Sequence, residues 1–208
     1  MSDKLNNPQK RDREKTSGAI LKIATKLFLK RGYAAVPISL IAEEAKVTKS
    51  LIYHYFGDKR GLWLAVKEEG VLSYSAQQRA VFSSTKTAHS AKAVTDSAAA
   101  YFSFLQKKPE IARMFALECL EGEFEAGATE KELQAGGIAL VRDLQSTGEL
   151  RDDIDPDMLL AVFAALIEHW FINRDRVAKL NDKAAGRALD ARYIDAVLKV
   201  LGNGLKTT

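Results

Sequence analysis

Cysteine and proline are both scarce in this chain of 208 residues. The single cysteine, Cys119, excludes an intramolecular disulfide framework and suits a reducing cytoplasm. Four prolines and few β-branched runs favour helix throughout. The longest apolar run, Met158–Ile167, has ten residues, whereas a membrane-spanning helix needs about 20. Residues 1–15 contain no apolar segment typical of a secretory signal, so we expect a cytoplasmic protein with no membrane partner.

The sequence also lacks the common patterns of catalytic and cofactor-binding residues. It contains no Ser/His/Asp order typical of hydrolases and no phosphate-binding loop. His54, His89 and His169 are too scattered to indicate a metal site. Gly136 and Gly137 do not follow a predicted strand, so they do not form a dinucleotide-binding fingerprint. We therefore expect neither an enzyme nor a bound metal or cofactor.

Positive charge is concentrated in the first part of the chain. Residues 1–60 hold 13 Lys and Arg against 6 Asp and Glu, whereas residues 61–208 hold 18 against 21. The formal net charge of +4 hides this asymmetry. A local basic surplus is what the neutralisation of DNA phosphates requires. Basic N-terminal segments also serve solubility, so charge alone does not decide between the two explanations.

Residues 36–59 predict two short helices joined by a tight turn. The first, Ile38–Ala45, has apolar residues at helical spacing, and Thr48 is placed to cap the second. Helical spacing turns three side chains of the second helix inward: Ile52, Tyr55 and Phe56. It leaves five on the outer side or its margin: Lys49, Ser50, Leu51, Tyr53 and His54. Cationic and hydrogen-bonding groups on the outside of the second helix are typical of a helix-turn-helix.

A longer helix, from about Asp12 to Arg31, is predicted to support this pair. Its apolar face consists of Ile20, Ile23, Ala24, Leu27 and Phe28. Gly32 supplies the left-handed residue that ends it. Residues 1–11 are polar, and four basic residues around the start of this helix are candidates for an arm that touches the minor groove or phosphates: Lys10, Arg11, Arg13 and Lys15. A solvated tail is the alternative.

The segments ILKIATKLFLKRGY, ISLIAEEAKVTKSLIYHYF and DKRGL, between Ile20 and Leu62, resemble the TetR family of bacterial transcriptional regulators. An ordered series carries the resemblance: an apolar run ending in LF, then GY, IA, V-[ST]-K, YF and K-x-x-L. It implies an all-α fold of about nine helices. Residues 1–60 would form a DNA-binding helix-turn-helix domain with a flexible N-terminal arm. Residues 61–208 would form a larger helical domain for effector binding and dimerisation.

The resemblance also implies roles for residues of the helix-turn-helix. Lys49, Ser50, Leu51 and His54 would approach base edges in the major groove. Thr48, Tyr53 and Lys59 would contact phosphates and fix the register, and Lys46 would add a positive charge beside the DNA.

Four residues depart from the family pattern. Val36 and Pro37 stand where the family usually has a Thr and a capping Ser or Thr, which puts the usual phosphate contacts there in doubt. Lys46 stands in the turn, where the family usually has Gly, so it must adopt a positive φ or use a different turn. Leu51, often a small residue in the family, stands on the face that meets the bases. The preferred DNA sequence therefore cannot be taken from relatives.

The rest of the chain predicts six further helices. They extend from about Asp58 to Gln78, Ala91 to Lys108, Glu110 to Leu120, Thr129 to Ser146, Pro156 to Ile172 and Asp182 to Leu201. Polar residues from Asn173 to Asn181 predict a link between the last two. Gly136 and Gly137 lie inside a predicted helix, where they either permit a close helix contact or mark a bend.

The helix after Pro156 is apolar on nearly all sides, since 13 of the 15 residues in MLLAVFAALIEHWFI are apolar. It must be covered on nearly all sides, either inside one domain or partly by a second copy. The resemblance favours a homodimer through helices at about 156–172 and 182–201. Two-fold pairing would place two recognition helices one DNA turn apart on a palindrome.

A small-molecule effector of unknown identity is the further partner that the resemblance implies. The candidates to line its pocket are Phe102, Phe104, Met114, Phe115, Cys119, Phe124, His169 and Trp170. Aromatic and Met residues at helical spacing are more often plain core. Glu118 and His169 interrupt apolar helices, so either is a candidate to orient a polar group of the ligand or an internally bonded residue.

Three functions follow from these observations. The first is a repressor that binds a palindromic operator and is released by a small molecule. The second is a DNA-binding protein of the same fold that is controlled by a protein partner instead of a ligand. The third, an enzyme, leaves the helix-turn-helix unexplained.

Overall fold

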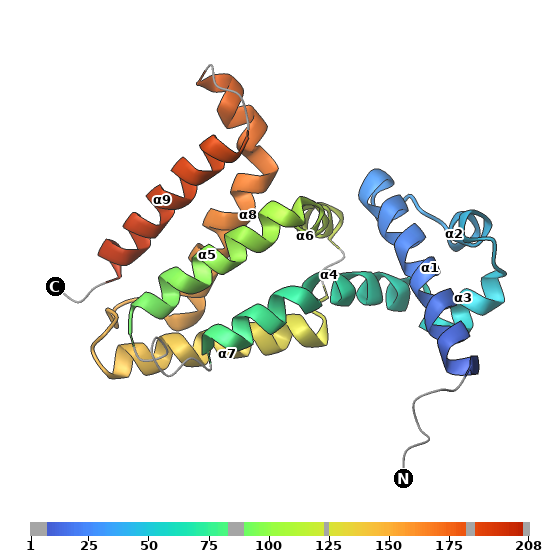
Figure 1. The fold of residues 1–208 in the computed structure, drawn as a ribbon, viewed down its shortest axis with the longest axis horizontal. Coiled ribbons are helices and arrows are strands. Elements are labelled where there is room, and N and C mark those ends of the chain that lie inside the picture. The colour runs from blue at the N-terminus through green and yellow to red at the C-terminus, as the bar shows by residue number, and fades with distance from the viewer. Residues whose placement is uncertain (1–7, 83–89, 123–124, 182–185, 206–208) are drawn as a thin grey trace, which may run out of the picture. The chain divides into compact units, whose positions relative to one another are not determined.

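The computed structural model describes residues 8–82, 90–122, 125–181 and 186–205 (Figure 1). This part of the chain forms nine α-helices and no strand, which confirms the all-α prediction. In chain order they are α1 (Pro8–Arg31), α2 (Ile38–Ala45), α3 (Lys49–Phe56), α4 (Lys59–Phe82), α5 (Lys92–Lys107), α6 (Pro109–Glu121), α7 (Ala128–Ser146), α8 (Pro156–Leu180) and α9 (Arg187–Gly204).

The chain divides into two compact units, each with its own core. The first contains residues 1–70 together with residues 117–127, and the second contains residues 71–116 and 128–208. The division falls inside α4 and again inside α6, so both helices contribute residues to both units.

The core of the first unit is built where α1, α2 and α3 meet. α1 packs against α2, and α2 packs against α3. The buried side chains come from the apolar faces that the sequence predicts, and include Ile20, Ala24, Leu27, Phe28, Ile38, Ile41, Ile52 and Leu62. Gly32 has φ 84°, which confirms its predicted left-handed conformation after α1.

The first helix begins earlier than predicted. α1 starts at Pro8 and not at about Asp12, so Lys10 and Arg11 belong to the same helix as Arg13 and Lys15, and contact of these four residues with DNA stays a prediction. The reason is compositional, because Lys, Arg, Gln and Glu dominate this segment and are good helix formers. The residues before Pro8 lie outside the described part of the chain.

In the second unit, α5 packs against α8 and α9, and α7 packs against α8. Gly137 explains the close approach of α7 to α8. A Cβ atom at Gly137 would lie 2.9 Å from Cδ1 of Leu160. Of the two possibilities for the glycine pair, the structure therefore supports a close helix contact at Gly137.

The predicted link from Asn173 to Asn181 is wrong, because α8 continues to Leu180. Its polar residues are compatible with helix, and Ala178 is buried on the inner face of this extension. Although α8 is 25 residues long, no helix in the described part of the chain is long and apolar enough to cross a membrane.

Candidate functional site

The turn between α2 and α3 is closed by Lys46 in the left-handed conformation. Its φ and ψ are 56° and 42°, and it is the only non-glycine residue with positive φ in the described part of the chain. This conformation lets the backbone N–H groups that follow α2 bond to the carbonyls of Ala42 and Glu43. Of the two alternatives left open by the sequence, a positive φ or a different turn, Lys46 takes the first, and its side chain is exposed.

The two helices of the motif are capped differently. Thr48 caps α3 as predicted, because its hydroxyl accepts a hydrogen bond from the Leu51 backbone N–H at 3.2 Å. Pro37 precedes α2 in an extended conformation and supplies no side-chain cap. Its carbonyl instead accepts from the N–H groups of Leu40 and Ile41. The departure from the family at Pro37 therefore removes a capping side chain and leaves the helix start intact.

The outer face of α3 carries the predicted DNA-contacting side chains. Ile52 is fully buried beneath it, and Tyr55 and Phe56 are half-buried. The exposed side chains are Lys49, Ser50, Tyr53 and His54, and Leu51 is half-buried at the margin. The structure thus brings these five groups to the accessible side of one short helix.

His54 is held by a residue of α1. The Arg13 guanidinium lies 3.2 Å from Nε2 of the His54 ring and can donate to it. In the neutral ring this leaves the proton on Nδ1. Arg13 on α1 therefore lies next to the exposed face of α3, a contact that the sequence did not indicate.

Lys59 lies at the start of α4, and its amino group already has partners within the chain. Its Nζ donates to the carbonyl of Ala34 at 3.1 Å and lies 4.4 Å from the centroid of the Tyr33 ring. The Asp58 carboxylate caps α4 by accepting from the Gly61 N–H at 2.7 Å. Lys59 thus ties the start of α4 to the segment after α1, and contact with a phosphate would be an additional role.

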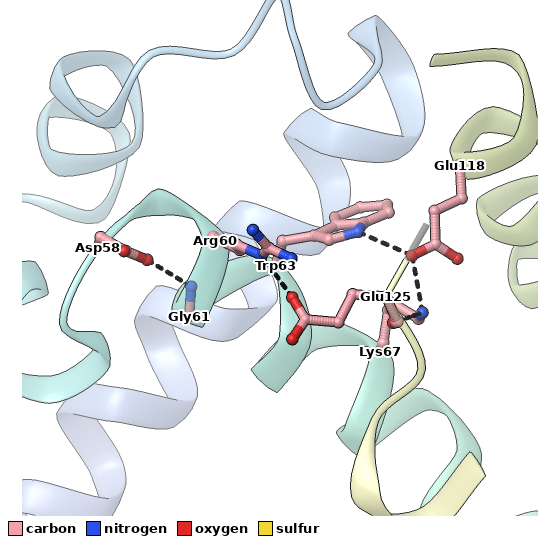
Figure 2. A network of polar contacts seen from close by, with 7 residues as sticks. All are labelled: Asp58, Arg60, Gly61, Trp63, Lys67, Glu118 and Glu125. Carbon is pink, nitrogen blue, oxygen red and sulfur yellow. Dashed lines mark hydrogen bonds and ion pairs between the residues drawn. The ribbon is translucent and has the colours of Figure 1, made fainter. Parts of the chain in front are cut away.

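A buried ion pair joins α4 to the end of α6 within the first unit. Figure 2 shows Nζ of Lys67 beside the Glu118 carboxylate, at 2.7 Å, with the Trp63 indole N–H donating to the same oxygen at 3.3 Å. Lys67 also donates to the carbonyl of Glu125 at 2.5 Å. Both charged groups of the pair are almost completely buried. Glu118, a candidate ligand contact from sequence, is therefore committed to Lys67 and Trp63.

Further contacts tie the same segment to the loop after α1 and to the start of α4. The Glu121 carboxylate accepts from the Ala34 N–H at 3.0 Å. It lies so close to Gly32 that a Cβ atom there would meet it at 2.1 Å. Arg60 pairs with Glu125 on the other side (Figure 2). The described residues of the segment 117–127 therefore contact residues 1–70 within the first unit through both ion pairs and backbone contacts.

Known protein families match both units. Residues 20–66 match the family described as bacterial regulatory proteins, tetR family, and residues 94–198 match a tetracyclin repressor-like C-terminal domain. The chain belongs to the TetR family. Among its relatives, the HTH-type transcriptional repressor SCO4008 of Streptomyces coelicolor is 31% identical over 166 residues, which cover 78% of this chain and 81% of the relative.

A second relative of this TetR-family chain is the HTH-type transcriptional repressor NicS of Pseudomonas putida. It is 27% identical over 169 residues, which cover 78% of each chain. The regulator SCO4942 of Streptomyces coelicolor has a similar fold, with a TM-score of 0.67 at 22% identity over 91% of this chain and 98% of that one. AibR, solved with isovaleryl coenzyme A and operator DNA, has a TM-score of 0.62 at 17% identity over 88% of this chain and 96% of its own. These likenesses establish the fold.

The structure separates the residues predicted to line a ligand pocket. Phe102, Phe104, Met114 and Trp170 are buried in the second unit, and Phe115 is half-buried. Cys119 belongs to the first unit and is exposed. His169 is exposed and lies against Asn173, and Phe124 lies outside the described residues. Cys119 and His169 therefore do not gather with the aromatic core.

Phe102 and Trp170 belong to a cluster whose polar groups are all paired. Trp170 stacks on Tyr193 with ring centroids 4.0 Å apart, and its indole N–H donates to the buried carboxylate of Asp190 at 2.9 Å. Asp190 also accepts from Gln106 and Arg174. Because every partner is supplied by the chain, this cluster acts as the structural joint between α5, α8 and α9.

Phe104 belongs to a second aromatic cluster, which contains groups that the sequence did not indicate. Tyr74 and Phe104 stack with ring centroids 5.1 Å apart, and the Tyr101 ring lies 4.7 Å from that of Tyr74. The Tyr101 hydroxyl donates to the Glu168 carboxylate. Burial raises the pKa of the Glu168 carboxyl above its usual value, and the charge of Glu130 adds to the increase.

Glu168 was missed in favour of its neighbour His169. Both interrupt the apolar sequence of α8, and successive residues point about 100° apart on a helix. Glu168 is half-buried toward Tyr101, whereas His169 is exposed. The useful signal was the position of Glu168 between Ile167 and Trp170, which are both buried.

Proposed function

We propose that this chain is a homodimeric transcriptional regulator that represses genes by binding a palindromic operator and is released by a small molecule. The observation that carries the DNA-binding part is the outer face of α3. It presents Lys49, Ser50, Tyr53 and His54 to solvent, while Ile52 anchors the helix to the core beneath. Lysine can donate to guanine O6 and N7, and hydroxyl and imidazole groups bond to base edges or phosphates.

The dimer is supported by an exposed apolar stripe on α8. Met158, Val162, Ala165, His169 and Ile172 are all exposed, at spacings of four, three, four and three residues. This average of 3.5 residues is the repeat of helices that pack along each other. The opposite side of α8, with Leu159, Phe163, Ile167 and Trp170, is buried inside the unit. Ala196 and Val200 extend the exposed apolar surface on α9.

Release by a ligand requires that the ligand favour one of two conformations. α4 and α6 both contribute to the two units, so a shift of either helix in the second unit reaches the first. A difference in affinity of about 1–3 kcal/mol between the two states is enough for regulation. A cytoplasmic location follows for a regulator of this kind.

Selection of bound fragments from genomic DNA, followed by footprinting, tests this function. We expect two protected half-sites with centres about 34–36 Å apart, one turn of DNA. A metabolite screen for release of the selected fragment then tests the effector. Protection of a single half-site would argue against the dimer, and absence of any selected fragment would argue against operator binding.

Control by a protein partner is the second candidate. The exposed side chain of Leu120, on the part of α6 that belongs to the first unit, favours it. If the purified protein binds its operator and no metabolite releases it, capture of a partner on this surface becomes the explanation.

A further inference from the structure

Three carboxylates lie in apolar surroundings, and they differ in their partners. Glu118 is paired with Lys67 at 2.7 Å, and Asp190 is paired with Arg174 at 3.3 Å. Glu168 accepts a hydrogen bond from Tyr101, but no Lys, Arg or His among the described residues pairs with it. Unlike the other two, the Glu168 carboxylate therefore has no countercharge from the described part of the chain.

The apolar surroundings of Glu168 make the absence of a countercharge energetically unfavourable. Tyr101 is buried, and its ring stacks near those of Tyr74 and Phe163, at centroid distances of 4.7 and 6.2 Å. A second carboxylate, Glu130 on α7, adds negative charge that Glu168 senses. Ionised carboxylates in apolar surroundings are normally paired. The aromatic rings and the Glu168 carboxylate together favour a positive charge at this place.

Two buried polar atoms, Gln78 Oε1 and Ser97 Oγ, lack a hydrogen-bond partner among the described residues, and Gln78 contacts Tyr74 of the same cluster. Gln78 is 1% exposed and Ser97 is 7% exposed. The Gln78 amide N–H group donates to the Tyr74 hydroxyl at 2.5 Å and to the Ser97 carbonyl at 3.2 Å, which leaves Gln78 Oε1 and Ser97 Oγ with no hydrogen-bond partner in the part of the chain that the structure describes. An unsatisfied buried polar group costs about 1–3 kcal/mol, so such groups call for an explanation.

We propose that the Glu168 cluster, which consists of Tyr74, Gln78, Ser97, Tyr101 and Glu168, binds a small organic cation with an aromatic or apolar body. The ligand's ammonium or amidinium group pairs with Glu168 and lies against the tyrosine rings, which attract cations through their π faces. Its remaining N–H groups satisfy acceptors that the chain leaves open, such as Gln78 Oε1. This inference rests on the ligand-released regulation proposed above and names the chemical class of the ligand.

Calorimetry on the full-length protein without DNA tests the inference. The probes are two cations, benzamidine and phenethylamine, with phenethyl alcohol and phenylacetate as the matched neutral and anionic compounds. We expect the cations to bind and to raise the Tm, the alcohol to bind at least about tenfold more weakly, and phenylacetate not to bind. Equal binding of all probes, or no binding of either cation, would overturn the inference.

Two carboxamide variants separate the cluster from general charge effects. Glu168→Gln keeps an acceptor for the Tyr101 hydroxyl and removes the charge, so cation affinity should fall at least about tenfold. Glu132→Gln removes an exposed carboxylate on α7 and should leave cation affinity unchanged. The Tm of each variant without probe shows that it is folded. Unchanged cation affinity in Glu168→Gln overturns the assignment.

A separate measurement distinguishes this inference from the proposed function. Fluorescence anisotropy of the selected operator fragment shows whether the protein binds DNA and whether the cations release it. Failure of cation binding with intact DNA binding rejects only the ligand assignment. Failure of DNA binding rejects the proposed function, whatever the calorimetry shows.

Discussion

The turn at Lys46 is a feature of a single residue that the sequence predicts. The family pattern and the position of Thr48 placed a turn at Lys46, and the structure holds it at φ 56°. The prediction succeeded because turn geometry is local and depends on a few neighbouring residues. The partners of Glu168 and Lys67 were not predictable, because they come from helices far away in the sequence.

The charge of Glu168 should cost stability at neutral pH. Burial raises the pKa of this carboxyl, with Tyr101, Tyr74 and Glu130 as its titratable neighbours. A carboxyl with a raised folded-state pKa stabilises the fold below its unfolded pKa and loses that contribution as pH rises through the folded pKa. Glu168→Gln should therefore have a higher Tm than the wild type at about pH 8 and a similar Tm at about pH 4.

Thermal unfolding followed by circular dichroism at both pH values measures this difference. Glu132→Gln, which removes an exposed carboxylate, is the control and should show no such pH dependence. A Tm difference for Glu168→Gln that is the same at both pH values would contradict the account.

At the scale of helices, the junction of α3 and α4 depends on the absence of a side chain at Gly61. A Cβ atom there would lie 2.0 Å from the carbonyl oxygen of Phe56, the last residue of α3. Gly61→Ala should therefore destabilise the protein by about 1–3 kcal/mol, because backbone must move to relieve the overlap. It should also weaken DNA binding, since α3 is displaced.

Gly18→Ala is the matched control, because nothing lies within 4 Å of a Cβ atom at Gly18 on α1. It should stabilise the protein by about 0.5–1 kcal/mol through helix propensity. Urea denaturation measures both variants. Equal and small effects for the two substitutions would contradict the proposed packing at Gly61.

The tether between α4 and residues 117–127 depends on the Lys67–Glu118 pair. Glu118→Gln removes one charge of this buried ion pair, which should cost about 3–5 kcal/mol. Glu132→Gln breaks the Arg79–Glu132 pair, whose side chains are 52% and 59% exposed, and should cost about 0–1 kcal/mol. If urea denaturation gives comparable losses of unfolding free energy for the two variants, the buried pair contributes no more to stability than the exposed one.

The ends of a helix were predicted well where neighbouring residues determine them. They were predicted poorly where contacts with residues far away in the sequence determine them. The bounds of α2 follow from Pro37 and the turn at Lys46, and the structure reproduces them. α8 extends beyond its predicted end because Arg174 finds a partner in Asp190 on α9, which no local pattern shows. The docking of residues 117–127 onto α4 is likewise a long-range contact.

At the scale of the whole molecule, the exposed stripe of α8 predicts a dimer that a charge should disrupt. Val162 lies near the middle of the stripe and is 56% exposed in one copy of the chain. Val162→Glu should give a monomer in sedimentation at micromolar concentration, because it buries an unpaired charge in the pairing face. Leu120→Glu, at a residue that is 83% exposed outside the stripe, should stay a dimer. A monomeric wild type, or a dimeric Val162→Glu variant, would reject this interface.

We propose that the outer face of α3 binds DNA, and the affinity of the protein for the selected operator fragment tests this directly. Lys49→Ala removes an exposed cation from that face and should weaken binding by about 1–3 kcal/mol in a gel-shift titration at fixed salt. Lys131→Ala, which removes an exposed lysine from α7, should bind like the wild type. The account predicts this separation with both variants still dimeric. Wild-type affinity in Lys49→Ala would contradict it.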